Sequence, residues 1–215
     1  MKFTLYTADC VGSLPNSIYP HKCVITDENS MKAAVAFDHV AAEYTNNHRS
    51  NMDFLSSDNI PMDCDNDHSE DPSDWVTPLE VAMAFPGVEF VVVYSRNNML
   101  PKSGKSARPR FHVYFPIKPI TDSTGYTALK KRIGAEFPYF DKNALDSARL
   151  LFGVPNPQVE IYSGDMSIVD FLDNADFEQW DNDSASVPEG SRNSTMSHFA
   201  GRVLKRFGDT EEAYA

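Results

Sequence analysis

The chain has 215 residues, of which 41% are hydrophobic, with 14 Phe and 9 Tyr. This is enough apolar material for one large domain or two small modules, and it excludes a disordered chain. The three cysteines are widely spaced, so we expect no disulfide framework and no paired-cysteine zinc site. No apolar run reaches about 18 residues, and the N-terminus does not resemble a signal peptide. We therefore expect a cytoplasmic protein without a membrane span.

The formal net charge is −12, although proteins that bind nucleic acid usually present a basic surface. The charge is unevenly distributed along the chain. Residues 53–74 are strongly acidic, whereas 96–110 contain basic residues and no acidic one, and a further basic group lies at 130–132. A site that binds metal ions and phosphates together needs both kinds of segment.

The N-terminal part of the chain shows short apolar segments. The pattern predicts strands over 3–7 and 22–26, followed by a helix over 27–44 with Ser30 as its N-cap and an apolar stripe at helical spacing. The segment 46–58 is polar and is expected to form a loop.

The middle of the chain carries clearer signals. Thr77 and Glu80 form a capping-box pattern around a proline, which predicts a helix that ends at about Phe85. The elements predicted after it are a strand over 90–94, a basic loop over 96–109, a strand over 111–115 ended by Pro116 and Pro119, a helix over 121–136, one or two helical turns over 143–151 and a strand over 159–162.

The order strand, helix, strand, strand, helix, strand between 60 and 162 is typical of a ferredoxin-like, or RRM-like, fold. We therefore predict an α+β protein in which an N-terminal α/β layer (about 1–58) and an RRM-like module (about 59–172) form one domain over 1–172. The acidic, Ser-rich stretch 173–193 is predicted to be a linker, and 194–215 a helical extension that begins a further module. Whether the native chain continues beyond Ala215 is left open.

Asp63 and Asp65 follow an apolar run and, on a strand, would point to the same side. Two adjacent carboxylates repel each other unless a cation lies between them, and Mg²⁺ or Mn²⁺ prefers such oxygen ligands. A solvated acidic loop is the plain alternative. A calcium loop over 63–74 is a second one, although His68 stands where such loops have Gly and Pro72 interrupts it.

Arg110, His112 and Tyr114 alternate on a predicted strand and share one face. A His between apolar residues is more often structural than functional, but a face with Arg and His after a basic loop suits the phosphates of a nucleotide. Ser95 and Lys105 add donors before this strand.

A third signal is Asp141 after two aromatic residues, for which helix capping is the plain explanation. Arg149 follows, and its plain explanation is an ion pair with Asp146 on a helix.

The order of these three signals resembles the motifs of the archaeo-eukaryotic primase superfamily, in which Asp-x-Asp is followed by a strand with His and then by a hydrophobic residue and Asp. The resemblance covers nearly the whole chain from about residue 30. Within the superfamily, the chain is similar to the primase-polymerase domains of bacterial phages and integrated mobile elements. It is carried by Phe37–Val40, Arg49, Asp63–His68, Asp74–Trp75, Tyr94–Asn97, Arg108–Phe115, Asp146–Gly153 and, in the tail, Glu189–Asn193 with Phe199–Arg202.

The resemblance implies a role for each residue. Asp63, Asp65 and Asp141 would be catalytic carboxylates that bind two Mg²⁺ or Mn²⁺ ions, with Asp146 as the rival for the third position. The nucleotide-binding residues would be His112, Arg110, Ser95, Lys105 and Arg149. The position of Arg110 is commonly small in the superfamily, so this chain departs from the pattern there.

The activity implied is template-dependent DNA primase or polymerase activity, with nucleotidyl transfer from an NTP or dNTP to a 3′-hydroxyl. The implied partners are a single-stranded DNA template beside the basic loop, a primer, and a helicase, either fused downstream or separate. Two alternatives remain: a metal-dependent phosphodiesterase or nuclease, and a non-catalytic module that binds single strands. The choice between NTP and dNTP, de novo priming, template and metal preference, and oligomeric state are left open.

Overall fold

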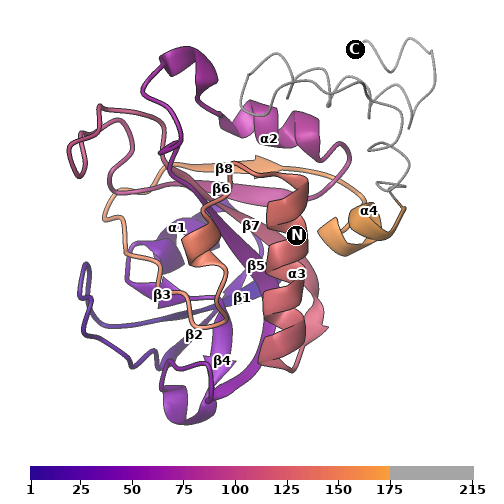
Figure 1. Cartoon of the computed structure of the whole chain (residues 1–215). Coiled ribbons are helices and arrows are strands. Elements are labelled where there is room, and N and C mark those ends of the chain that lie inside the picture. Colours follow the sequence, from indigo (N-terminus) through magenta and orange to yellow (C-terminus); the bar gives the residue numbers. More distant parts are fainter. Residues whose placement is uncertain (175–215) are drawn as a thin grey trace.

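Two antiparallel sheets organise residues 1–174, the part of the chain that the computed structural model describes (Figure 1). The smaller sheet has the order β2-β1-β3, with β1 (Phe3–Thr7), β2 (His21–Ile25) and β3 (His39–Val40). The larger sheet has the order β4-β5-β7-β6-β8, with β4 (Ala42–Tyr44), β5 (Phe54–Cys64), β6 (Phe90–Tyr94), β7 (Phe111–Ile120) and β8 (Val159–Tyr162).

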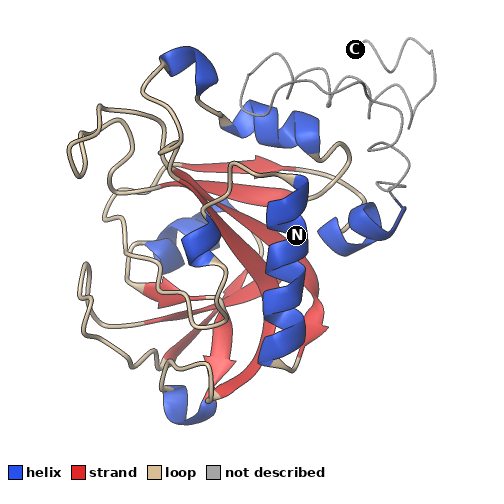
Figure 2. Cartoon of the chain, in the orientation of Figure 1, coloured by secondary structure: helices blue, strands red, loops and turns tan. Residues whose placement is uncertain are grey.

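Helices pack on both faces of the larger sheet (Figure 2). They are α1 (Glu28–Val35), α2 (Pro78–Ala84), α3 (Ser123–Glu136) and α4 (Ile168–Asn174), with 3-10 turns η1 (Thr45–Asn47), η2 (Pro72–Asp74) and η3 (Lys142–Ala144). Among the described residues, no helix has the length and apolar character needed to cross a membrane.

The larger sheet has a core on each face. Met62, Val92 and Val113 alternate onto the face that packs against α2, α3 and α4. Val93 and Tyr114 point to the opposite face, where α1 and β1 cover them. Because side chains alternate along a strand, Asp63, next to Met62 on β5, and His112, next to Val113 on β7, point towards the N-terminal layer. The two-layer arrangement therefore places those polar side chains between the layers.

The mixed α+β architecture with antiparallel sheets is confirmed, but the ferredoxin-like strand order holds only in part. The sequence of elements β5-α2-β6-β7-α3-β8 is the predicted one, and β5, β7 and β6 are neighbours in the order that a ferredoxin-like fold requires. The last strand, β8, pairs with β6 through Phe90↔Tyr162, instead of with β5. The free edge of β5 is taken by β4 from the N-terminal layer.

The predicted helix over 27–44 is wrong beyond Val35. Asp38 is fully buried and accepts hydrogen bonds from the amides of Gly12, Ser13 and Gly153, each at 2.7 Å. Beyond Val35 the chain instead pairs with strands, His39 and Val40 with β1 and the residues of β4 with β5. The N-cap is Asp27, whose side chain accepts from the amide of Ser30 at 2.8 Å, so the predicted cap Ser30 is the third helical residue.

Other boundaries also differ from the prediction. Strand β5 begins at Phe54, so part of the expected loop 46–58 is strand. Strand β7 continues through Pro116 and Pro119. Its pairing with β6 ends at Tyr114 of β7, so on that side the prolines interrupt no hydrogen bond between strands.

Of the one or two helical turns predicted over 143–151, the structure has the 3-10 turn η3, which begins one residue earlier. Helix α4 was not predicted, and it includes the first two residues of the expected linker 173–193. The rest of that linker and the expected helical segment 194–215 lie outside the described residues. Strands over 90–94 and 159–162 and helix α2 with its capping box are confirmed.

The acidic and basic segments bind each other. The guanidinium groups of Arg108 and Arg110 are fully buried, and both pair with Asp67, Arg110 at 3.2 Å and Arg108 at 3.8 Å. Arg108 also pairs with Glu70, and the Lys105 ammonium donates to the main-chain oxygen of Asp67 at 2.5 Å. We call these five residues the loop clasp. It fixes the β6–β7 loop against the segment that follows β5.

Replacing Asp67 by Ala would leave two buried guanidinium groups with fewer counter-charges. We expect the free energy of unfolding to fall by about 2 kcal/mol, as for other buried charged groups that lose a partner. Urea denaturation measures this change. The control is Asp9→Ala, which removes a carboxylate paired with His21 at an exposed site and should change stability little. Equal losses in the two variants would show that the loop clasp does not stabilise the fold.

A buried His–Tyr pair joins the two layers. His39 Nε2 lies 2.7 Å from the hydroxyl of Tyr114, and His39 Nδ1 lies 2.8 Å from the carbonyl of Phe37. The carbonyl can only accept, so Nδ1 carries the proton and Nε2 accepts from Tyr114. Burial lowers the pKa of His39 to about 4, and the ring is therefore neutral at neutral pH.

This pair makes stability depend on pH. Below pH 6.5 the unfolded chain protonates His39 while the folded protein does not, so the free energy of unfolding falls as the pH drops from 6.5 towards 4, by up to about 3 kcal/mol from this residue. Urea denaturation across that range should show a shallower decline in His39→Gln than in the wild type. Tyr114→Phe keeps His39 buried and should retain the wild-type decline. Parallel declines in His39→Gln and the wild type would contradict the assignment.

Candidate active site

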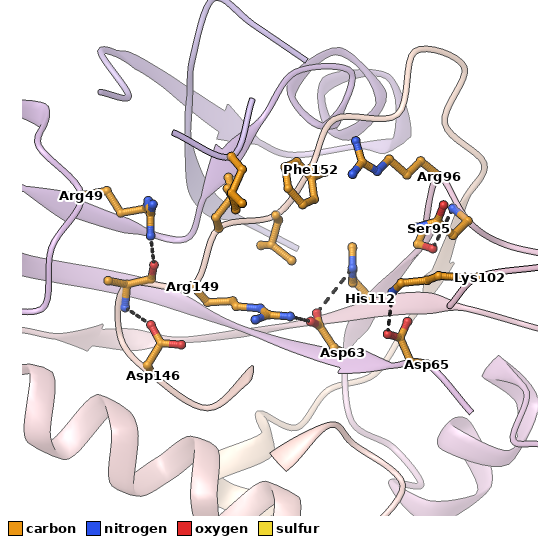
Figure 3. A pocket seen from close by; sticks show the side chains of 15 residues that line it. Arg49, Asp63, Asp65, Ser95, Arg96, Lys102, His112, Asp146, Arg149 and Phe152 are labelled. Carbon is orange, nitrogen blue, oxygen red and sulfur yellow. Dashed lines mark hydrogen bonds and ion pairs between the residues drawn. The ribbon is translucent and has the colours of Figure 1, made fainter. Parts of the chain in front are cut away.

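A cavity of about 330 Å³ lies between the larger sheet and the N-terminal layer (Figure 3). Four regions line it: the loops that follow β1 and η1, the end of β5, strand β7 with the loop that precedes it, and the segment 146–152. The lining residues are Leu14, Arg49, Asp63, Asp65, Ser95, Arg96, Asn97, Lys102, His112, Asp146, Ala148, Arg149, Leu150, Leu151 and Phe152. Carboxylates and basic side chains thus meet in one pocket.

Asp63 lies at the centre of the pocket, where β5 is directly opposite His112 of β7. Its side chain is only 8% exposed. One carboxylate oxygen is 3.4 Å from His112 Nε2, and the other accepts from the Arg149 guanidinium at 2.5 Å. Burial alone would raise the pKa of Asp63, but the charges of His112 and Arg149 hold it below the usual 3.8. Asp63 is therefore a buried anion at neutral pH.

Asp65 is the second carboxylate and is more accessible. It follows Asp63 by two residues, and its carboxylate pairs with the Lys102 ammonium at 3.1 Å and lies 3.8 Å from Nε of Arg110. Each of the two neighbouring carboxylates is thus balanced by a different side-chain cation (Figure 3).

Two further arginines line the pocket and pair with no carboxylate within residues 1–174. The Arg49 guanidinium donates to the carbonyl of Ala148 at 2.9 Å. The Arg96 guanidinium lies 3.9 Å from the centre of the Phe152 ring. The Nε atoms of Arg49 and Arg149 are buried and have no hydrogen-bond partner among the described residues. Buried donors without partners are costly unless a ligand or water satisfies them.

The segment 146–153 is held in place from both layers. The buried Lys130 ammonium donates to the carbonyls of Ala144 at 2.7 Å and Asp146 at 3.3 Å. At the other end, Gly153 donates to Asp38, and a side chain at Gly153 would come within 2.6 Å of the main chain of Phe37. Only glycine fits so close an approach. These anchors fix the backbone that carries Arg149 and Phe152.

The structure brings most of the predicted site residues together. Asp63, Asp65, His112, Ser95 and Arg149 all line the pocket. The plain alternative for Arg149, an ion pair with Asp146 on a helix, does not hold, because its guanidinium pairs with Asp63.

Arg110 and Lys105 do not line the pocket, although we expected both to bind nucleotide. Both belong to the loop clasp, and the Arg110 side chain is fully buried, with its guanidinium also donating to the carbonyl of Leu100 at 2.9 Å. In this structure Arg110 is enclosed by its loop-clasp partners, whereas the Lys105 side chain is 34% exposed outside the pocket.

The two rivals for the third carboxylate lie differently. The amide of Asp141 donates to the carbonyl of Asp63 at 2.8 Å, which places this residue beside the part of the β5 edge that β4 does not cover. Its side chain caps η3 through the amide of Asn143. Asp146 lines the pocket, and its carboxylate accepts from the amide of Ala148 at 2.9 Å. The negative charges of both act on Arg149.

The donor chemistry of the pocket fits divalent cations at Asp63 and Asp65. Asp63 pairs with Arg149 and Asp65 pairs with Lys102. Each of these two cationic groups lies at a position where a carboxylate would also attract a metal ion. No group of three or more His, Cys, Asp or Glu side chains within 1–174 is arranged to hold a metal ion, so this structure holds neither a calcium loop over 63–74 nor a third carboxylate in place beside Asp63 and Asp65. In that loop, Asp67 pairs with arginines and Asp71 caps η2.

Arg49 and Arg96 belong to the segments that carry the resemblance, but the sequence does not assign them to the site. Arg49 lies in a polar segment with no periodicity, and nothing local in the sequence shows that it faces Ala148, about a hundred residues later. Arg96 is one of several basic residues in its loop, and only the structure separates it from those that form the loop clasp.

No family model matches the sequence, and no curated protein matches it. Among solved structures, the chain is similar to the AEP domain of the cyanophage S-2L primase-polymerase, with a TM-score of 0.40 and 15% sequence identity over 76% of this chain and 81% of that chain.

Proposed function

We propose that the protein is a template-dependent DNA primase-polymerase that transfers nucleotides from NTP or dNTP to a 3′-hydroxyl. The observation that carries this proposal is a single pocket with a carboxylate pair at its base and several basic side chains around it. We call Arg49, Arg96, Lys102, His112 and Arg149 the basic wall. Carboxylates suit divalent metal ions, and a basic wall with unsatisfied donors suits a triphosphate.

In this proposal Asp63 and Asp65 hold Mg²⁺ or Mn²⁺. When bound, two such ions promote loss of the proton from the attacking 3′-hydroxyl and stabilise the pyrophosphate that leaves. We propose Asp141 as the third carboxylate, because its main chain is bonded to that of Asp63 and its charge reaches Arg149. Asp146 remains its rival.

The basic wall orients the triphosphate. His112 and Arg149 already lie at Asp63, so a phosphate bound to an ion on that carboxylate would meet their donors. Ser95 and Lys102 line the same side of the pocket and offer further donors. Holding the α-phosphorus in line with the 3′-hydroxyl is the main contribution that a protein makes to such a transfer.

The template and primer are proposed to approach over Arg49 and Arg96, the two pocket arginines without an acidic partner. The template was expected beside the basic loop, but Lys105, Arg108 and Arg110 are engaged in the loop clasp. These three cations of the expected basic loop are therefore not available to the DNA backbone, so we expect weak and salt-sensitive binding that a helicase or another partner would support.

Primer extension on single-stranded DNA, with Mg²⁺ or Mn²⁺ and labelled NTP or dNTP, tests the proposal. Asp63→Asn and Asp65→Asn should each reduce the rate by more than about 100-fold, because loss of groups that merely orient metal ligands already costs 10–100-fold. The matched control is Asp170→Asn on α4, which packs on the other face of the sheet and should keep wild-type activity. Unprimed template separates priming from extension.

Different failures of this assay have different meanings. Activity that survives in both carboxylate variants would contradict the proposed metal site. Shortening of the DNA in place of extension would favour the phosphodiesterase alternative, and binding without any reaction would favour the single-strand-binding alternative. A larger loss in Asp146→Asn than in Asp141→Asn would assign the third carboxylate to Asp146.

A further inference from the structure

Arg149 occupies the carboxylate on which the proposed metal site depends. Its guanidinium lies 2.5 Å from Asp63, and this carboxylate is almost fully buried, whereas the Arg149 side chain is 34% exposed. The pair joins residues that are 86 positions apart in the sequence. Arg149, from a distant segment of the chain, is thus the counter-ion of a carboxylate that has little contact with solvent.

The surroundings of Arg149 are strongly acidic. Burial lowers the pKa of its guanidinium, but the charge and hydrogen bond of Asp63, together with the charges of Asp141 and Asp146, raise it overall. Asp63 and both rivals for the third metal-binding carboxylate therefore all act on this one guanidinium. It stands where a divalent cation would be attracted by the same charges.

A guanidinium and a divalent ion cannot share this position at low cost. Two like charges a few ångströms apart repel each other, and the repulsion is stronger in a partly buried site than in water. A metal ion that binds Asp63 must therefore displace Arg149. The displaced guanidinium would need new acceptors, and its Nε already lacks one.

We infer that Arg149 is an exchangeable counter-ion that couples the binding of metal ion and triphosphate, holding Asp63 in the free protein and moving to the phosphates when the metal ion arrives. The inference rests on the proposed function. Only the side chain has to move, because the backbone between η3 and β8 that carries Arg149 is anchored by Lys130 and at Gly153. The consequence is that metal ion alone binds weakly and that nucleotide strengthens its binding.

Lys102 offers an internal comparison. It pairs with Asp65 at 3.1 Å, but both partners are more exposed than Asp63, with 39% and 28% of their side chains accessible. Water can replace Lys102 at that carboxylate, so its departure costs less than that of Arg149. Arg149 rather than Lys102 should therefore set the coupling.

Binding of Mn²⁺, followed by the electron paramagnetic resonance signal of the free ion, tests this without measuring catalysis. Without nucleotide, Arg149→Gln should bind Mn²⁺ at least about tenfold more tightly than the wild type, within the usual range of coupling between two ligands. Lys102→Gln should show a smaller gain, Arg149→Lys should stay close to the wild type, and Asp63→Asn should lose the site. A non-hydrolysable dNTP should tighten Mn²⁺ binding in the wild type and much less in Arg149→Gln.

The possible results separate the inference from the proposed function. If Arg149→Gln binds Mn²⁺ no more tightly than the wild type, while Asp63→Asn still abolishes binding, the counter-ion role is wrong and the metal site stands. If no variant shows Mn²⁺ binding that depends on Asp63, with or without nucleotide, the proposed metal site fails and the inference fails with it. Circular dichroism confirms that each variant is folded, and Arg149→Lys retains the charge if Arg149→Gln unfolds.

Discussion

An anion at Asp63 has to be held inside the protein, between a β-sheet and the layer that covers it. A buried carboxylate is costly unless cations and hydrogen bonds compensate for the lost water. His112 provides one partner from the neighbouring strand, and Arg149 provides the other from a segment far along the chain. That segment is held in turn by Lys130 from α3 and by Asp38 from the N-terminal layer. Compensation of one charge thus ties both layers to the site.

The distribution of charge explains how a chain with net charge −12 can form a pocket for phosphates. The acidic run after β5 and the basic loop before β7 neutralise each other in the loop clasp, so neither dominates the pocket. What remains at the pocket is a local pattern, with two carboxylates at the base and basic side chains around them. The net charge therefore predicts weak affinity for DNA but says little about the chemistry of the site.

Much of the sheet and the heart of the site could be predicted from the sequence. The strand at 90–94 is a continuous β-branched and aromatic run, and Asp63 and His112 were each predicted as site residues on separate strands, which the structure pairs directly. The motif order also pointed to Asp65, Ser95 and Arg149, which line the pocket.

The rest could not be predicted because it depends on long-range contacts. The break in the predicted helix over 27–44 follows from amides that reach Asp38 from Gly12 and Gly153. Arg110 looked like a ligand for phosphates because its strand face carries His112, but Asp67 and the Leu100 carbonyl engage its guanidinium in the interior. In the larger sheet β8 pairs with β6 and β4 pairs with β5, and no local pattern in the sequence encodes these pairings.

A crystal structure of the protein with Mn²⁺ and a non-hydrolysable nucleoside triphosphate tests the central claim most directly. The account predicts anomalous scattering peaks at bonding distance from the carboxylates of Asp63 and Asp65, with the triphosphate against His112 and Arg149. Manganese bound elsewhere, for example at the acidic residues of the loop clasp, or a triphosphate outside this pocket would contradict it.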